Sequence, residues 1–493
     1  MVLFGDVLKK CIENNNIKIY QLSQSSGIGR TYIHKIISQG SIPSEENFQS
    51  LINALSISPF EKDELLTAYK ISKDGEFLYN QRIQVKRLID RMCEVQQLST
   101  PMKNNFQIKE KADESRRETE VINGELSVNH ALESLLSREA DFYKNPCVRF
   151  IIPRDYNFFY NNLFLKYCKN PALKIECLFE FSKKNEIVKE KRNSNLDVIG
   201  ALMPFIMKAG GSFTAYYLYS AFPVKYVPTV ATPYFLITHD CVTAFTIDLQ
   251  TAIIFRNAEI IECYNKIFDD MKHKAQPLIG YVESLEDSIM FYGDIEKSGA
   301  TGISGFGSHP CVAVYYNKEV LEAHIPHGLP SREQMIEVIT MLGSGLRKLA
   351  DKGNTPSFFT LDGFDLFVRK GIIETIMEGF FRTCTPPERA EVIKKMITDT
   401  ENDSILYRTI NTSNIKVPSC FYTDVFPNSH MNLVIGSPVD GKTADISTIK
   451  IGESSIVAAF HDFLVNAVDS DLVYSKTDTL KVLREALETL TNS

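Results

Sequence analysis

Apolar residues recur at helical spacing through about the first 70 residues of the chain. The spacing predicts a helix over residues 4–15, two short helices between residues 17 and 44, and a fourth helix directly after them. The segment Ser58-Pro59-Phe60-Glu61 is a capping box with proline at the first helical position, and it predicts a fifth helix. Five short helices predict one small all-α domain over residues 1–70.

The two helices within residues 17–44 have the spacing of a helix-turn-helix motif. Ile19 and Leu22 lie three residues apart on the first helix, and Ser26-Gly27 suits the tight turn that follows. The apolar face of the second helix consists of Ile28, Ile33, Ile36 and Ile37. Burial of that face leaves polar side chains pointing outward, which favours a DNA-entering surface.

The same segment resembles the lambda-repressor/Cro-like (xenobiotic-response-element) helix-turn-helix family. The matching positions are Ser26-Gly27-Ile28, Tyr32-Ile33-His34-Lys35-Ile36, Gly40, Pro43-Ser44 and Leu51-Ile52-Asn53-Ala54-Leu55. The resemblance covers only the first 70 residues or so, and it implies double-stranded DNA as a partner without indicating an operator.

The resemblance implies a set of DNA-contacting residues: Gln21, Arg30, Thr31, Tyr32, His34, Lys35 and Ser41. Arg30 and Thr31 begin the second helix, where side chains reach base edges; an arginine can donate two hydrogen bonds to guanine, worth about 1–3 kcal/mol of discrimination. His34 and Lys35 are expected on bases or phosphate, and Gln21 and Ser41 on phosphate. A merely solvated face is the alternative.

Residues 71–145 are predicted to form a helical linker. An apolar stripe between Ile83 and Leu98 is flanked by basic residues, which fits either a linker helix packed on its neighbour or a dimerisation helix. The polar, charge-rich stretch 99–125 is typical of an exposed connector.

Beyond residue 146 the pattern changes to a mixture of strands and helices. Strands are expected at 148–152, 174–181, 213–219, 234–237, 242–247 and 252–255, with helices at 195–209 and 258–271. The pattern predicts an α/β or α+β lobe over residues 146–296.

The closing part of this lobe recurs 195 residues later. The paired positions are Ile254 with Ile449, Ile261 with Ile456, Phe268 with Phe463, Leu278 with Val473 and Leu285 with Leu480, and Phe235-Leu-Ile237 matches Leu433-Val-Ile435 after a shift. We therefore expect a two-lobed, internally duplicated module, with a glycine-rich linker at 297–310 and a second lobe at 311–493; chance agreement is the alternative. In the second lobe, capping boxes at Ser331 and Thr385 mark helix starts.

The charge distribution and the cysteine content limit where DNA could bind and in which compartment the protein is expected. The net charge of −7 argues against DNA binding in general, but residues 1–40 carry five Lys or Arg against two acidic residues, so the basic charge is local. Ten cysteines occur without a Cys-x-x-Cys pair, which excludes a zinc ribbon. Without a secretory leader or a long apolar run, we expect a cytoplasmic protein with reduced thiols and no membrane contact.

Residues 436–443 match the phosphate-loop pattern Gly-x4-Gly-Lys-Thr, which would place Gly441, Lys442 and Thr443 on a nucleotide. The residues that follow alternate like a strand, however, and Asp440-Gly441 is a hairpin signal. A β-hairpin is the favoured interpretation, and a nucleotide site is the alternative.

Other chemical motifs are weak. The glycine run at 299–307 lacks the strand that precedes a dinucleotide fingerprint, and His324-Ile-Pro-His327 is too short and proline-broken for a metal site. The paired lobes are similar to those of phospholipase-D-like proteins, but neither contains a His-x-Lys signature. We expect no catalytic residues, metal or cofactor.

The predicted function is therefore a homodimeric transcriptional regulator with an N-terminal DNA-binding domain. Its two-lobed C-terminal module would sense a small molecule, a peptide or a protein, or would oligomerise. An enzymatic or nucleotide-binding module with a regulatory DNA-binding domain is the alternative.

Overall fold

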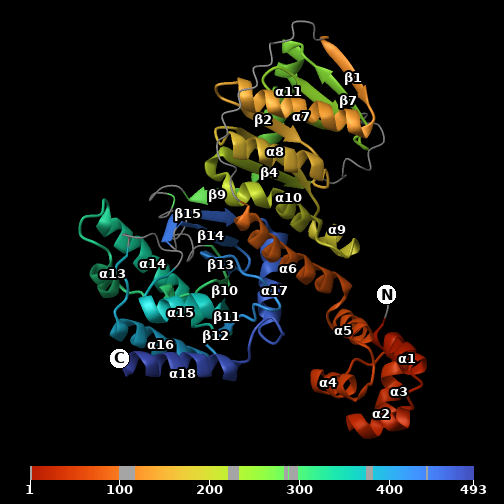
Figure 1. Ribbon diagram of the computed structural model, residues 1–493, viewed down its shortest axis with the longest axis vertical. Helices are drawn as coiled ribbons and strands as arrows, with labels where there is room; N and C mark the ends of the chain where they lie inside the picture. The colour runs from red at the N-terminus through yellow and green to blue at the C-terminus, as the bar shows by residue number, and fades with distance from the viewer. Residues whose placement is uncertain are drawn as a thin grey trace. The chain divides into compact units, whose positions relative to one another are not determined.

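A computed structural model describes residues 3–98, 117–219, 232–282, 287, 298–373, 381–439 and 442–492. The chain divides into two compact units (Figure 1). The first comprises Met1–Gln84 with Lys184–Asn193, and the second comprises Val85–Lys183 with Ser194–Ser493.

The first unit is all-α, as predicted. Its helices are α1 (Phe4–Asn14), α2 (Ile19–Ser26), α3 (Arg30–Gln39), α4 (Glu45–Ala54), α5 (Pro59–Asp74), the start of α6 (Glu76–Gln97) and the short α9 (Lys184–Lys189). The capping box is confirmed: the Ser58 hydroxyl accepts the Glu61 N–H, and the Glu61 carboxylate accepts the Ser58 N–H. The first five helices therefore follow the periodicity of the sequence.

An aromatic cluster holds these helices together. The rings of Phe48 and Tyr69 stack at 3.9 Å between centroids, and Phe4 meets both edge-on at 5.6 Å. All three are buried, and such pairs stabilise a core beyond the area that they bury. The Tyr69 hydroxyl donates to the Pro43 carbonyl at 3.1 Å, which fixes the turn before α4.

The second unit contains an eight-stranded sheet in the order β1-β7-β6-β5-β2-β3-β4-β8. Its strands are β1 (Thr119–Asn123), β2 (Cys147–Ile151), β3 (Lys174–Phe181), β4 (Phe213–Tyr219), β5 (Tyr234–Ile237), β6 (Val242–Phe245), β7 (Thr251–Phe255) and β8 (Gln276–Pro277). The accompanying helices are α7 (Glu125–Phe142), α8 (Asn157–Lys169), α10 (Ser194–Lys208) and α11 (Ala258–Lys272). The six strands and two helices predicted for this lobe are confirmed.

A seven-stranded sheet follows in the order β12-β11-β10-β13-β14-β15-β9. Its strands are β9 (Ile279–Val282), β10 (Ser304–Gly307), β11 (Thr355–Phe359), β12 (Ile405–Thr409), β13 (Phe421–Phe426), β14 (His430–Val439) and β15 (Lys442–Ile451). The helices that go with it are α13 (Lys318–His324), α14 (Arg332–Ala350), α15 (Leu361–Lys370), α16 (Pro386–Glu401), α17 (Ser454–Ala467) and α18 (Lys476–Thr491).

The two sheets share one pattern of strand pairing. In each, three strands separated by helices run parallel (β2, β3, β4; β10, β11, β12), and an antiparallel series continues from the first of them (β5, β6, β7; β13, β14, β15). The pairs Ile254 with Ile449 and Phe268 with Phe463 occupy corresponding elements, whereas Leu285 lies outside the described residues.

One upstream equivalence is wrong by one strand. Phe235-Leu-Ile237 lies in β5, but Leu433-Val-Ile435 lies in β14, which has the place of β6 in its own sheet. Both segments are short apolar runs in antiparallel strands, so composition alone cannot separate them.

The boundaries of the lobes also differ from the prediction. The first sheet begins with β1, before residue 146, and β9 joins the second sheet although it precedes residue 296. Within the expected linker 297–310, residues 304–307 form the buried strand β10. A Cβ atom on Gly305 would lie 2.2 Å from the Tyr422 hydroxyl, and one on Gly307 2.5 Å from the Tyr422 ring. These glycines permit close packing and do not mark a flexible connection.

The stripe on α6 is buried within the chain itself. Its residues Val85, Leu88, Ile89, Met92 and Val95 belong to the core shared by strands of both sheets. Two polar contacts fix the same helix: Asp90 accepts the Lys416 N–H at 3.1 Å, and Gln96 accepts the Ser419 N–H at 2.9 Å. The stripe therefore packs as a linker helix would. Within the described part of the chain, none of the helices combines the length and hydropathy needed to cross a bilayer.

The two predicted capping boxes of the second lobe have different outcomes. Thr385 and Glu388 form the box at the start of α16. Ser331 precedes α14, but its side chain makes no capping hydrogen bond because its backbone is left-handed, with φ of 56°. The sequence pattern located the helix start and missed its geometry.

Candidate nucleic-acid interface

The turn between α2 and α3 is fixed by local hydrogen bonds. Gly27 ends α2 with φ of 72°, a conformation that favours glycine. The Ser26 hydroxyl donates to the Leu22 carbonyl at 2.6 Å, and the Ser23 hydroxyl donates to the Ile28 carbonyl at 2.7 Å. These bonds set the angle at which α3 leaves the turn.

Helix α3 is held against α1 along one face only. Ile33 and Ile36 on that face are completely buried. A Cβ atom on Gly5 would lie 2.3 Å from the Ile36 carbonyl oxygen, so α1 and α3 approach more closely than any larger residue allows. The opposite face of α3 is consequently left exposed.

That opposite face carries the residues predicted to contact DNA. Arg30, Thr31, His34 and Lys35 are exposed, and Tyr32 is half-buried against the core. Gln21 is exposed on α2, and Ser41 is half-buried just after Gly40, whose φ of 66° ends α3. Six of these seven side chains thus lie on α2 and α3, and Ser41 follows directly.

The positive charges on this face are not neutralised internally. Among the described residues, neither Arg30 nor Lys35 takes part in an ion pair. The N-cap of α3 is Gly29, which supplies no side-chain cap. Unpaired cations beside an uncapped helix start form a surface suited to phosphate and base edges.

The structure adds Tyr20 to this surface. Its ring is 57% exposed and lies 5.4 Å from the Arg30 guanidinium carbon, a cation–π geometry. The sequence signal was an aromatic residue at a polar position beside Gln21, on a helix whose apolar positions were already assigned. Tyr20 can restrict the rotamers of Arg30 and so orient it.

The segment with the phosphate-loop pattern has strands on both sides. β14 and β15 pair antiparallel, with Val439 opposite Lys442 and Pro438 opposite Thr443, and Gly441 lies outside the described residues. A phosphate loop instead leads into a helix whose N–H groups bind the phosphates. The antiparallel pairing of β14 and β15 agrees with a β-hairpin and not with a phosphate loop.

Comparison with known proteins bears on the N-terminal domain. Residues 8–62 match the helix-turn-helix family. The match confirms the predicted lambda-repressor/Cro-like helix-turn-helix motif. The mixed α/β region that follows it is seen in the two sheets and their helices. No curated protein matches the chain.

Two solved structures show distant similarity to this chain. TrmBL2, an archaeal chromatin protein whose structure shows a novel mode of DNA binding, is 12% identical, with a TM-score of 0.23 over 45% of this chain and 72% of its own. Phosphatidylserine synthase from Haemophilus influenzae Rd KW20 is 8% identical, with a TM-score of 0.24 over 76% of this chain and 92% of its own.

Among the described residues, the cysteines and histidines considered as candidate reactive or metal-binding groups form no cluster. None of the ten cysteines forms a disulfide bond, and within the described ranges there is no grouping of three metal-ligating side chains. His324 is buried, and its ring stacks on Phe381 at 4.7 Å between centroids. It is part of the packing in the second sheet's helical layer.

Proposed function

We propose that this chain is a sequence-specific transcriptional regulator that acts on double-stranded DNA as a homodimer. The observation that carries the proposal is the outward face of α3, which is exposed, cationic and unpaired within a matched helix-turn-helix domain. A single domain of this size makes few phosphate contacts, so useful affinity requires two domains about 34 Å apart on successive turns of DNA.

The C-terminal module is proposed to be a duplicated regulatory module without enzymatic activity. Support comes from the shared strand pairing of the two sheets and from α6, which joins the first unit covalently to the core of the second. A ligand or partner protein that favours one packing of this core would shift the positions available to α6 and hence the operator affinity.

The test is selection of bound sequences from a random duplex library with the full chain, followed by a footprint on the enriched sequence. We expect an enriched two-part site whose halves lie about 10 base pairs apart centre to centre. The logarithm of the affinity should fall with the logarithm of salt concentration in proportion to the phosphates contacted. Equal binding to all sequences would contradict the proposal.

A further inference from the structure

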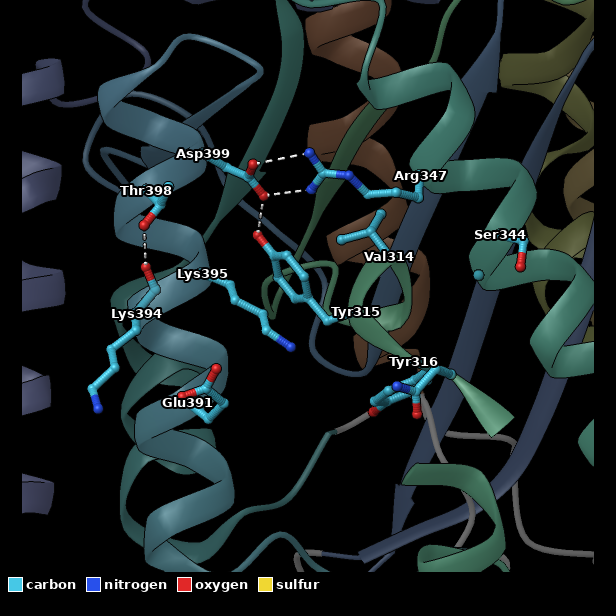
Figure 2. A pocket seen from close by; sticks show the side chains of 12 residues that line it. Val314, Tyr315, Tyr316, Ser344, Arg347, Glu391, Lys394, Lys395, Thr398 and Asp399 are labelled. Atoms are coloured by element: carbon cyan, nitrogen blue, oxygen red, sulfur yellow. Dashed lines mark hydrogen bonds and ion pairs between the residues drawn. The ribbon is translucent and has the colours of Figure 1, made fainter. Parts of the chain in front are cut away.

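A cavity of about 660 Å³ lies in the second unit between α14, α16 and the 3-10 turn Ala313–Tyr315 (Figure 2). Its size falls in the range of small-molecule sites. Three basic and two acidic side chains line it, together with hydroxyl and aromatic groups.

One side of the cavity is a polar wall held together by hydrogen bonds. Arg347 from α14 donates two hydrogen bonds to Asp399 on α16, at 2.8 and 3.1 Å, and the Tyr315 hydroxyl donates to the same carboxylate at 2.7 Å. Asp399 is buried, and the bonds from Arg347 and Tyr315 outweigh that burial, so its pKa is lowered. Arg347 and Asp399 thus neutralise each other, and neither charge is available to a ligand.

Three further charged side chains beside the cavity, Glu391, Lys394 and Lys395, form no ion pair with any described residue. Glu391 and Lys395 lie one turn apart on α16, a spacing that normally allows an ion pair, yet neither forms one with any described residue. Figure 2 shows Lys395 extending from α16 toward Tyr315, whereas Lys394 points away. An anionic and a cationic group are therefore available side by side.

The facing side of the cavity is apolar and aromatic. Val314, Tyr315 and Tyr316 line it, and the Tyr316 hydroxyl oxygen is buried without a hydrogen-bond partner among the described residues. This side suits the substituent of a ligand whose charged groups face α16.

We propose that this cavity binds a small zwitterion with an apolar or aromatic substituent, the chemistry of a free amino acid. Lys395 binds its carboxylate, Glu391 binds its ammonium group, and the substituent packs on Val314 and Tyr316. A ligand that carries only a negative charge would be repelled by Glu391, and a ligand that carries only a positive charge would be repelled by Lys395. The effect of such binding on DNA affinity rests on the proposed function, whereas the ligand site does not depend on it.

The first experiment is calorimetric titration of the full chain with each standard L-amino acid. We expect one or a few to bind with a dissociation constant below about 1 mM. The best binder is then compared with its analogue that lacks the ammonium group and its analogue that lacks the carboxylate. Each analogue should bind at least tenfold more weakly.

Two substitutions test which side chain binds which charged group of the ligand. Glu391→Gln should weaken binding of the amino acid at least tenfold but strengthen binding of the analogue without an ammonium group, because it removes a repelling charge. Lys395→Gln should weaken binding of the amino acid and strengthen binding of the analogue without a carboxylate, for the same reason. Exposed residues elsewhere in this unit, in Lys370→Gln and Glu337→Gln, serve as controls with unchanged binding. The proposed site is overturned if none of the amino acids binds, or if neither substitution changes the affinity for the best binder.

DNA affinity measured in the same samples separates the two proposals. A ligand that binds through Glu391 and Lys395 without changing operator affinity supports the cavity and contradicts sensing. Operator binding with no response to any amino acid supports the DNA-binding function and, if calorimetry also shows no heat, overturns the cavity proposal.

Discussion

Arg30 begins α3 with an exposed, unpaired guanidinium beside the Tyr20 ring. Arg30→Ala is expected to reduce discrimination between the selected operator and random DNA by about 1–3 kcal/mol, since a bidentate contact to guanine is lost. Fluorescence anisotropy with both duplexes measures this difference.

A matched control uses Lys10, an exposed lysine on α1. Lys10→Ala should leave the discrimination between the two duplexes unchanged, even if overall affinity falls slightly through its charge. Equal loss of discrimination in both variants would contradict a base contact by Arg30.

Asp424 is half-buried in the second sheet, opposite Gly305 and Asn432, and one of its carboxylate oxygens is buried. Burial raises the pKa of its carboxyl to about 7, against a partial lowering by Tyr422. The folded state therefore holds this proton more tightly than the unfolded state, so its contribution to stability is complete below about pH 4 and is lost as pH rises through about 7. The slope is at most about 1.4 kcal/mol per pH unit.

Asp424→Asn should remove that slope, because the amide is neutral throughout. Urea unfolding of the wild-type chain and the variant at pH 5 and pH 8 tests this, with the variant gaining relative stability at pH 8. Identical pH profiles would show that the Asp424 carboxyl is solvated in the folded protein. Asp362→Asn, at an exposed position on α15, is the control.

Helices α14 and α16 are tied by Arg347, which pairs with a buried and an exposed carboxylate. Asp399 is 10% exposed, whereas Asp351 is 56% exposed. Asp399→Ala should destabilise the fold by about 3 kcal/mol, because it removes the buried carboxylate that accepts two hydrogen bonds from Arg347 and one from the Tyr315 hydroxyl. Asp351→Ala should cost less than about 1 kcal/mol. Chemical denaturation compares them, and equal losses would contradict the wall described above.

Helical elements were predictable where periodicity and capping agree. The isoleucines of α3, the Ser58 capping box and the Thr385 capping box each located a helix, because these signals depend on neighbours in sequence. The orientation of Arg30 and Lys35 followed from the same periodicity.

Strand β10 was not predictable because its signal is non-local. Four glycines between residues 299 and 307 favour a loop, and only the approach of Tyr422, more than a hundred residues later, explains why Gly305 and Gly307 lie in a buried strand. For the same reason, the sequence could not reveal that Arg347 and Asp399 close a cavity beside Glu391 and Lys395.

At the scale of the whole molecule, the apolar stripe of α6 is used within the chain's own core. The proposed dimer therefore requires a different surface. Sedimentation at micromolar concentration is expected to give about twice the chain mass of 55.8 kDa. A monomer that remains monomeric on operator DNA would contradict the proposed pairing.

The central claim is that the exposed face of α3 reads a DNA sequence. Selection from a random duplex library, carried out in parallel with the wild-type chain and Arg30→Ala, tests it most directly. We expect an enriched two-part site for the wild type and weaker base preference at specific positions of that site for the variant. Failure of the wild type to enrich any sequence, or the same site from both proteins, would contradict it.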